Sequence, residues 1–414
     1  MDPGPTARRH LEELVFPFWL RHGVDETYGG FFTCFDNRGR ERVSTDKFTW
    51  SQGRFVWLLA RAARLAARGL LDLDAAALIR HAERGARFLT DHAIRPDGTC
   101  AFLLDRNGAP KGPDDRSVYA DCFAAMGLAE LARYTGDPAR LPVVDAIIDR
   151  ATADVRDGSA PTPPYPVPPG YTAFGTRMIL LNARLDQVRA YASSAPNTEP
   201  AARARAALAA SRADMLSFRE TDGRFTEMRT TGDPGTLLAR HRTPGHALEG
   251  LWMALEAGDL LGDHTADADL LTSVDALCRQ GWDTEHGGLL RYTDADGPSA
   301  PTGTPTGAPY EDLVRATWST KLWWVHSEAC YTTRLAAHRY GDRAAAAWFD
   351  RVWDYTLATF PGGDDGEEWI QIRDRAGRPR DEVVALPVKD PYHISRNLMQ
   401  LVELRADPRD PIRD

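Results

Sequence analysis

Two histidines occupy predicted helix starts, where an imidazole can move protons. His246 follows a Pro-Gly pair and His393 follows Asp390-Pro-Tyr, and proline is typical of the first turn of a helix. Glu249 lies three residues after His246, a spacing at which a helix brings the carboxylate to the imidazole and holds its pKa near neutrality. Arg396 follows His393 by one turn. The pattern predicts a pair of acid/base groups, although each histidine taken singly could be a packing residue.

Arg54 gives a second chemical signal, because a guanidinium near a helix start needs an anionic partner. That partner is either a carboxylate such as Asp46 or a substrate oxygen that becomes negative during the reaction. Trp50 lies one turn before Arg54, and aromatic faces suit the C–H faces of sugars, though a core position fits equally well. Further substrate contacts are expected at or near the starts of similar helices, at Tyr119, Asp121, Met178, Asn182, Trp252, Trp324, Glu328 and Arg396.

The elements that must position these residues are helices. Apolar residues at i, i+3, i+4 and i+7 predict about twelve of them. They fall at residues 6–22, 50–68, 74–93, 117–135, 138–155, 174–195, 199–218, 244–261, 266–280, 318–340, 343–359 and 391–405.

Most connections after the odd-numbered helices look alike. They combine Asp, Gly and short apolar alternation, which predicts small β-hairpins. The stretch 157–169 begins in the same way but is rich in proline, which indicates an irregular loop. The predicted hairpins lie at 25–32, 97–102, 222–226, 283–290 and 365–370.

A helix pair and its hairpin recur at roughly 60 to 80 residues, a period typical of stacked helical repeats. Six such pairs can close into an all-α (α/α)6 barrel, with the even-numbered helices inside and the hairpins on one face. Residues 1–414 would then form one domain, and the inner helices would bring both histidines and Arg54 to one mouth. An open α-solenoid that binds other proteins is the alternative.

Bulk composition excludes several classes of protein. Hydrophobic residues make up 43% and charged residues 26%, as in ordinary globular proteins, and the apolar runs are too short to cross a membrane. The first residues lack the layout of a secretory signal, so we expect a cytoplasmic protein. Five cysteines are scattered without CxxC pairs, and the net charge of −9 is spread along the chain; a disulfide framework and a nucleic-acid partner are therefore not expected. A homodimer is left open.

Motifs for cofactors are missing from the sequence. It contains no GxxxxGK[ST] phosphate loop, no GxGxxG after a strand and no HExxH. We therefore expect neither a nucleotide nor a metal to take part.

Several stretches together resemble the N-acylglucosamine 2-epimerase superfamily, which includes cellobiose 2-epimerases and mannose isomerases and whose fold is the (α/α)6 barrel. The resemblance implies acid/base roles for His246 and His393, an essential Arg54 and a Glu249 that supports His246. It also implies pocket roles for Tyr119, Trp324 and Glu328. The stretches are 23–32, 47–54, 117–123, 178–182, 245–249, 321–328 and 392–396.

Two of these stretches depart from common patterns of the superfamily. Tyr392-His-Ile-Ser-Arg396 stands where Phe-His-x-Pro-Arg is usual. Met178-Ile-Leu-Leu-Asn182 lacks the third histidine of disaccharide epimerases and mannose isomerases. In this respect the stretch is closer to the acylglucosamine branch of the superfamily.

The resulting hypothesis is proton transfer at C2 of an open-chain aldose, with or without an N-acyl group, through an enediolate. One histidine removes the C2 proton, and the other returns a proton either to the opposite face of C2, which is epimerisation, or to C1, which is aldose–ketose isomerisation. Two alternatives are a glycoside hydrolase that uses Asp121 with Glu328 or Asp365, and a carbohydrate- or protein-binding module without enzymatic activity.

Overall fold

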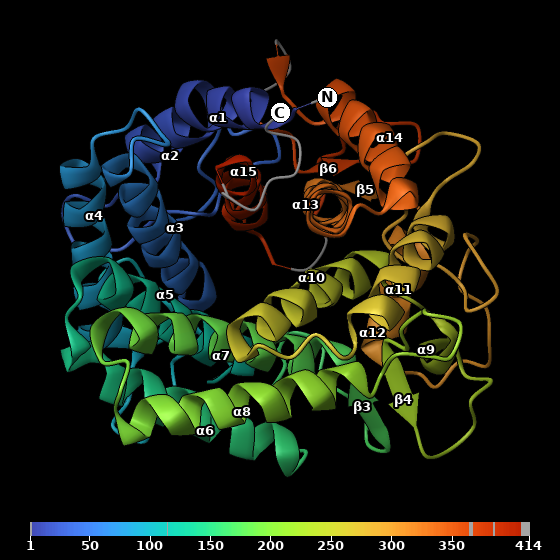
Figure 1. Ribbon diagram of the computed structural model, residues 1–414, viewed down its shortest axis with the longest axis horizontal. Helices are drawn as coiled ribbons and strands as arrows, with labels where there is room; N and C mark the ends of the chain where they lie inside the picture. The colour runs from blue at the N-terminus through green and yellow to red at the C-terminus, as the bar shows by residue number, and fades with distance from the viewer. Residues whose placement is uncertain (1, 114, 364–366, 384–385, 407–414) are drawn as a thin grey trace.

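The structure is a computed structural model that describes residues 2–113, 115–363, 367–383 and 386–406. Its helices form two concentric rings (Figure 1). In the inner ring each helix packs against the next and α15 packs against α3, which closes the ring and confirms the predicted (α/α)6 barrel. The inner helices are α3 (Thr49–Ala67), α5 (Val118–Thr135), α7 (Phe174–Ser194), α10 (Pro244–Leu261), α13 (Trp323–Tyr340) and α15 (Tyr392–Arg405).

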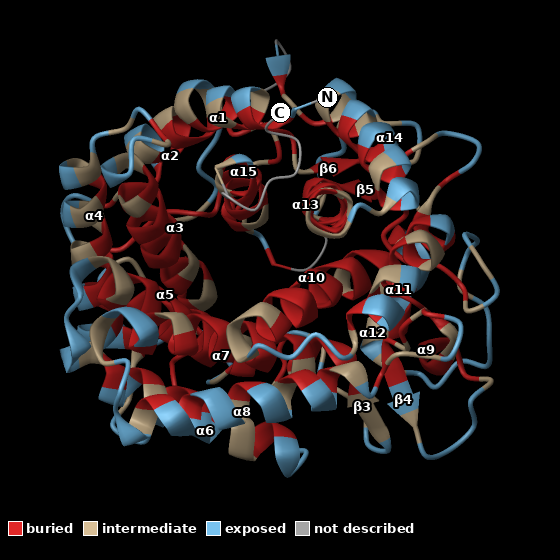
Figure 2. Ribbon diagram, in the orientation of Figure 1, coloured by how far each residue is buried: buried red, intermediate tan, exposed pale blue. Residues whose placement is uncertain are grey.

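The outer ring covers the inner one, and its helices show a buried inner face and an exposed outer face (Figure 2). Three outer helices begin at a side-chain cap: Asp74 for α4, Thr198 for α8 and Asp342 for α14. The outer ring consists of α1 (Gly4–His10), which continues through the π-helical turn η1 (Leu11–Val15) into α2 (Phe16–His22), α4 (Ala75–Phe88) with η2 (Leu89–Ala93), η3 (Pro138–Arg140) with α6 (Leu141–Arg156), α8 (Glu199–Leu216), α11 (Asp267–Gly281) and α14 (Arg343–Thr359).

Helices α3 and α5 approach closely because glycines stand at their contact. A Cβ on Gly53 would lie 2.2 Å from the Phe123 carbonyl oxygen, and one on Gly127 would lie 2.5 Å from the Gly53 carbonyl oxygen. Side chains there would force the two helices apart, since packed interiors leave little room for added atoms.

The predicted hairpins at 25–32, 97–102, 222–226 and 283–290 form, but they are held by isolated bridges such as Val24 to Phe31 and Trp282 to Leu289. The start of the hairpin predicted at 365–370 lies outside the described residues. The two-stranded ladders run instead between one repeat and the next, all antiparallel. They pair β1 (Lys47–Phe48) with β2 (Leu103–Leu104), β3 (Tyr171–Ala173) with β4 (Met228–Thr230) and β5 (Lys321–Leu322) with β6 (Ile372–Arg373).

These ladders fix the starts of alternate inner helices. The first N–H of a helix has no acceptor within the helix, and here it finds one on the following hairpin. Thr49 N donates to the Phe102 carbonyl at 3.0 Å, Phe174 N to that of Glu227 at 2.9 Å, and Trp323 N to that of Gln371 at 3.0 Å.

A second repeated device uses the fourth residue of an inner helix. Gln52 of α3 accepts a hydrogen bond from Phe31 N. His326 of α13 accepts one from Leu289 N. Asp121 of α5 accepts one from Cys100 N at 2.6 Å. Each tethers the hairpin to the helix start.

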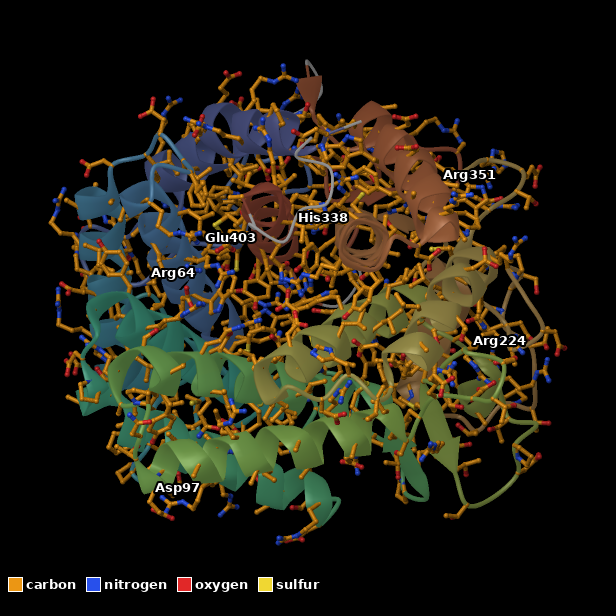
Figure 3. The ribbon with its side chains drawn as sticks, in the orientation of Figure 1. Arg64, Asp97, Arg224, His338, Arg351 and Glu403 are labelled. Carbon is orange, nitrogen blue, oxygen red and sulfur yellow. The ribbon has the colours of Figure 1, made fainter. Side chains whose placement is uncertain are left out.

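Charged side chains gather at the end of the barrel opposite the hairpins and form ion pairs there. Figure 3 shows Arg64 and Glu403 toward the inside of the ring, and Arg351 of α14 and the hairpin residues Asp97 and Arg224 at the periphery of the molecule. Arg64 Nη2 is 3.1 Å from Glu403 Oε1. Cations near the C-terminal ends of helices also complement the helix dipoles.

One predicted helix, 318–340, differs from the structure. Its helical part begins later, as α13 at Trp323, because Lys321 and Leu322 extend as β5 to pair with β6. The helices α12 (Pro309–Thr317) and α9 (Leu237–Arg240) were not predicted. Among the helices of the described residues, none has the length and apolar character needed to cross a bilayer.

Candidate active site

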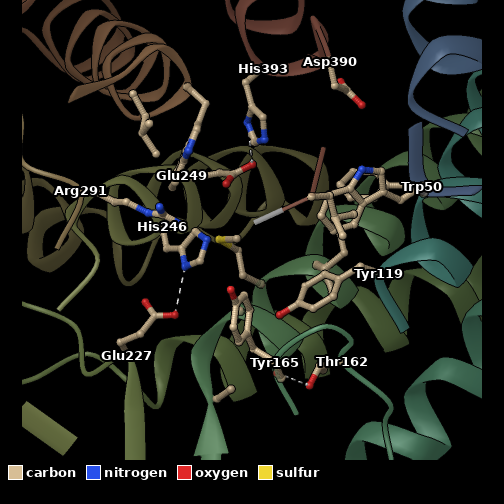
Figure 4. A pocket seen from close by; sticks show the side chains of 18 of the residues that line it. Trp50, Tyr119, Thr162, Tyr165, Glu227, His246, Glu249, Arg291, Asp390 and His393 are labelled. Carbon is tan, nitrogen blue, oxygen red and sulfur yellow. Dashed lines mark hydrogen bonds and ion pairs between the residues drawn. The ribbon is translucent and has the colours of Figure 1, made fainter. Parts of the chain in front are cut away.

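The starts of the inner helices surround a cavity of about 300 Å³. Figure 4 shows His246, Glu249 and His393 on one side of this pocket and Trp50 and Tyr119 on the other. The wall contains most of the residues that the sequence proposed for the site: Trp50, Arg54, Tyr119, Met178, Asn182, His246, Glu249, Trp324 and His393.

Both histidines contact the same indole. The Trp324 ring centroid lies 5.3 Å from that of His246 and 5.4 Å from that of His393. Residues from two helices far apart in the sequence are thus brought together by an aromatic side chain of a third. Two imidazoles therefore share one pocket.

His246 is oriented by Glu227, which directly precedes β4. Its Nδ1 lies 3.0 Å from Oε1 of Glu227, so its Nε2 is left for the cavity. Burial lowers the pKa of His246, but the charge and hydrogen bond of Glu227 and the charge of Glu249 together outweigh burial and leave the pKa above its ordinary value. His246 is therefore suited to donate a proton.

His393 is oriented by Glu328, whose Oε1 lies 2.8 Å from its Nδ1. Burial lowers the pKa of His393, and the carboxylates of Glu249 and Glu328 do not fully offset it because Arg54 lies close by; the pKa stays below its ordinary value. His393 is therefore suited to accept a proton. The pKa of His246 is raised and that of His393 is lowered, and such opposite shifts are typical of an acid/base pair.

Arg54 faces the pocket from α3. Its Nη2 is 3.3 Å from Nε2 of His393, and its Nη1 is 3.5 Å from Oδ2 of Asp390. Its guanidinium also lies 4.1 Å from the ring of Phe123, a cation–π contact. The carboxylate suggested by the sequence, Asp46, pairs instead with Lys111.

The expected contact between Glu249 and His246 is corrected by the structure. Oε1 of Glu249 accepts a hydrogen bond from Nη2 of Arg396 and lies 3.8 Å from Nδ1 of His393. The i+3 spacing places Glu249 near His246, but the buried guanidinium draws its carboxylate toward α15.

Four residues expected to contact substrate lie outside the cavity wall. Glu328 and Arg396 are buried behind His393, where Nη2 of Arg396 donates to Oε1 of Glu328 at 2.6 Å. Trp252 Nε1 donates to the other oxygen of Glu328 at 2.8 Å. They support His393 without reaching the cavity.

Asp121 is the fourth, and its carboxylate is used by the backbone of Cys100. Burial raises its pKa to about 6. It therefore acts as a tether like Gln52, and it does not line the cavity in which a substrate contact was expected. Asp365, named with it for a hydrolase, lies outside the described residues.

Within the described part of the chain, one set of potential metal ligands is close together: Glu249, Glu328 and His393 within 4.8 Å. Arg396 donates to both carboxylates. A cation here would meet a fixed positive charge, so the chemistry of these residues fits an ion-pair network better than a metal site.

Several wall residues were not predicted. Glu227 and Asp390 carry charge, and Tyr165, Tyr292 and Tyr310 come from the proline-rich loop, the segment before α12, and α12. The repeat could have indicated Glu227. Its carbonyl accepts a hydrogen bond from the first N–H of α7, just as the carbonyls of Phe102 and Gln371 accept from the first N–H of α3 and α13. Aligning the hairpins of the repeats would have placed Glu227 beside a helix start.

Comparison with known proteins shows the family of the chain. A profile of the N-acylglucosamine 2-epimerase (GlcNAc 2-epimerase) family matches residues 30–396. The chain belongs to this family. It is 31% identical to N-acylglucosamine 2-epimerase of Bos taurus over 414 residues, covering 96% of this chain and 89% of the relative. The predicted class of enzyme, a carbohydrate epimerase or isomerase, is confirmed at the level of the family.

Solved structures of the fold agree as well. Cellobiose 2-epimerase from Bacillus thermoamylovorans superposes with a TM-score of 0.74 at 18% identity, covering 96% of this chain and 98% of that one. A D-mannose isomerase gives a TM-score of 0.74 at 18% identity, covering 97% and 98%. At these identities the likeness concerns the family's barrel fold and leaves the substrate open.

Proposed function

We propose that this member of the family epimerises a free aldose, with or without an N-acyl group, at C2 by proton transfer between His393 and His246. The observation that supports this most is the pair of imidazoles against Trp324, each with Nδ1 on a carboxylate and the two with opposite pKa shifts. Acid/base exchange at a carbon next to a carbonyl needs one proton acceptor and one proton donor at the same carbon.

In the proposed reaction, neutral His393 takes the C2 proton of the open-chain sugar. The electron pair moves to the C1 carbonyl oxygen, and the Arg54 guanidinium stabilises the resulting enediolate oxygen. Protonated His246 then returns a proton to the opposite face of C2, and the epimer is released. After this step His393 is protonated and His246 is neutral. Exchange with solvent or the reverse reaction restores their starting states.

Glu227, Glu328, Glu249 and Arg396 act through the histidines in this proposal. Glu227 and Glu328 each accept from Nδ1 of one imidazole and so orient its ring. Arg396 offsets the negative charge of the carboxylates beside His393, so that His393 loses its proton more easily than His246 does. Trp50, Tyr119, Met178, Asn182 and Trp324 would contact the sugar itself. No metal or cofactor takes a step in this proposal.

The proposed cellular setting is the cytoplasm. All five cysteines are buried and unpaired, as is usual for proteins of reducing compartments. We also propose that residues 1–414 act as one catalytic domain.

The experiment is incubation in D2O with mannose, glucose, their N-acetyl forms and disaccharides, followed by separation of products and measurement of deuterium at C2. Conversion between C2 epimers with one deuterium gained supports the proposal. A ketose product would assign the aldose–ketose isomerase alternative, and released reducing ends would assign a hydrolase.

Single variants sharpen this experiment. His246→Asn should retain deuterium exchange from the epimer whose proton His393 removes, and His393→Asn from the other epimer, while both lose net conversion. The exposed His22→Asn should behave as the unsubstituted enzyme. Full conversion in either of the first two variants would refute the acid/base assignment.

A further inference from the structure

Asp390 presents an unusual carboxylate to the cavity. The residue is 6% exposed and lines the wall three residues before His393. Its Oδ1 accepts a hydrogen bond from Tyr392 N at 2.9 Å. Within the described residues no donor reaches hydrogen-bonding geometry at Oδ2, the atom nearest Arg54. Because a buried acceptor without a donor is costly, this oxygen is suited to a donor from a ligand.

The carboxylate is held rigidly. The backbone N–H of the preceding residue, Lys389, donates to the Thr33 carbonyl at 2.8 Å. The Lys389 ammonium is fully buried and lies 2.7 Å from Oε1 of Glu368. Asp390 is thus fixed before any ligand arrives, as a specific recognition group must be.

The neighbouring charges define which ligand group fits. An anionic group would be repelled by Asp390, and a cationic group by Arg54, whose Nη1 is 3.5 Å away. A neutral hydroxyl satisfies both, since it can donate to the carboxylate and accept from the guanidinium. The chemistry favours one hydroxyl shared by the two residues.

The two ends of the Arg54 guanidinium indicate where that hydroxyl lies. Nη2 is beside Nε2 of His393, at the reacting carbons, whereas Nη1 is beside Asp390. The two nitrogens of such a fork contact neighbouring oxygens. In the proposed reaction Arg54 stabilises the enediolate oxygen on C1, and the oxygens on C1 and C3 flank the reacting C2. With Nη2 at the C1 oxygen, the hydroxyl at Nη1 is the one on C3.

We infer that Asp390 is a specificity-determining residue that, with Arg54, recognises the C3 hydroxyl of the open-chain sugar. This inference rests on the proposed function, and the carboxylate acts by binding substrate and takes no proton from C2. It predicts that the enzyme selects sugars with a free C3 hydroxyl.

The test compares the best aldose substrate with its 3-deoxy and 6-deoxy analogues. For the unsubstituted enzyme, loss of the C3 hydroxyl should lower kcat/KM by roughly 10- to 100-fold, the range for a hydrogen bond to a charged group. Asp390→Asn, which keeps an oxygen to accept from Tyr392 N, should lower kcat/KM for the parent sugar by a similar factor and leave the 3-deoxy rate nearly unchanged. The ratio between the two substrates should collapse, while the ratio for the 6-deoxy analogue stays the same.

Asp342→Ala is the matched control, because it removes a helix cap from α14 in the outer ring. It should leave every ratio unchanged. If Asp390→Asn lowers kcat/KM equally for the parent and 3-deoxy sugars, or lowers it for neither, the inference is wrong. The proposed function survives that result, because exchange at C2 continues. If the unsubstituted enzyme exchanges no C2 proton in any sugar, the proposed function itself is wrong.

Discussion

Nδ1 of His246 lies 3.0 Å from Oε1 of Glu227. Glu227 is placed by its backbone, because its carbonyl oxygen accepts from Phe174 N at the start of α7. The strand pairing of β3 with β4 therefore positions a carboxylate that α10 itself does not supply. The pairing of β3 with β4 on the hairpin face therefore affects the pKa of His246, through the position of Glu227.

Replacing Glu227 with Gln should shift the pH dependence of catalysis. The Glu227 charge raises the pKa of His246 against the opposing effect of burial, and the proposed acid must be protonated. Activity is thus lost as pH rises through this pKa, and without the carboxylate the alkaline limb of kcat/KM should move to lower pH. The acid limb, which follows the lowered pKa of His393, should stay in place. Profiles of kcat/KM against pH measure both limbs, with the exposed Glu41→Gln as control; an unmoved alkaline limb would contradict the assignment.

Arg54→Lys should lower kcat with little change in KM. A lysine keeps the charge but loses the fork that spans His393 and Asp390. Loss of one well-placed oxyanion donor costs about 10²- to 10³-fold in kcat. Steady-state kinetics beside Arg95→Lys, a change at a surface ion pair with Asp115, would measure this. A variant with raised KM and normal kcat would mean that Arg54 only binds the ground state.

The cavity residues that the sequence predicted all lie on inner helices. The starts of α10 and α15 are marked by proline, and the i, i+3, i+4 pattern places His246 and His393 correctly at one mouth. It could not predict which carboxylate each imidazole contacts, because Glu227 and Glu328 come from other repeats. For the same reason Glu249 was assigned to His246, its neighbour in sequence, although Arg396 of α15 binds it.

The fold shows the same division between local and distant contacts. Helix ranges and turns follow from local periodicity and from Asp-Gly spacing. The ladders were not predicted, since β1 pairs with β2 across a whole helix pair, and two- or three-residue strands carry almost no alternation. Asp121 looked catalytic for a related reason: a buried carboxylate at a helix start has one sequence signature whether it meets a substrate or the Cys100 backbone.

Gly245→Ala should impair catalysis without touching a titratable group. An added Cβ would lie 2.6 Å from the Trp324 ring and 3.0 Å from Val325. Trp324 would have to move, and both imidazoles rest against it. A shift of about 1 Å in reacting groups can cost on the order of 100-fold in rate, so kcat/KM should fall strongly. Gly232→Ala, which meets little beyond Thr230 at 3.4 Å, should retain full activity; equal rates in the two variants would mean that the indole does not position the histidines.

Asp283→Asn should destabilise the barrel by about 3–5 kcal/mol, the usual cost of removing one partner of a buried ion pair. Lys321 is fully buried with its ammonium 3.1 Å from Oδ2 of Asp283, and Arg375 binds the same carboxylate. Burial opposes ionisation of Asp283, but Arg375 and Lys321 outweigh it and hold its pKa far below the ordinary value. The stabilisation is therefore complete above the unfolded pKa and is lost as pH falls toward the folded one.

Urea denaturation at several pH values measures this difference in the free energy of unfolding. At neutral pH the variant should unfold at lower urea than the unsubstituted protein, and the two should converge as the solution becomes strongly acidic. Glu285→Gln is the control, because its carboxylate also pairs with Arg375 but its side chain is 66% exposed, and exposed pairs contribute about 0–1 kcal/mol. Equal losses from both substitutions would mean that the buried lysine does not need its aspartate, and that this tether between hairpin and inner helix is replaceable.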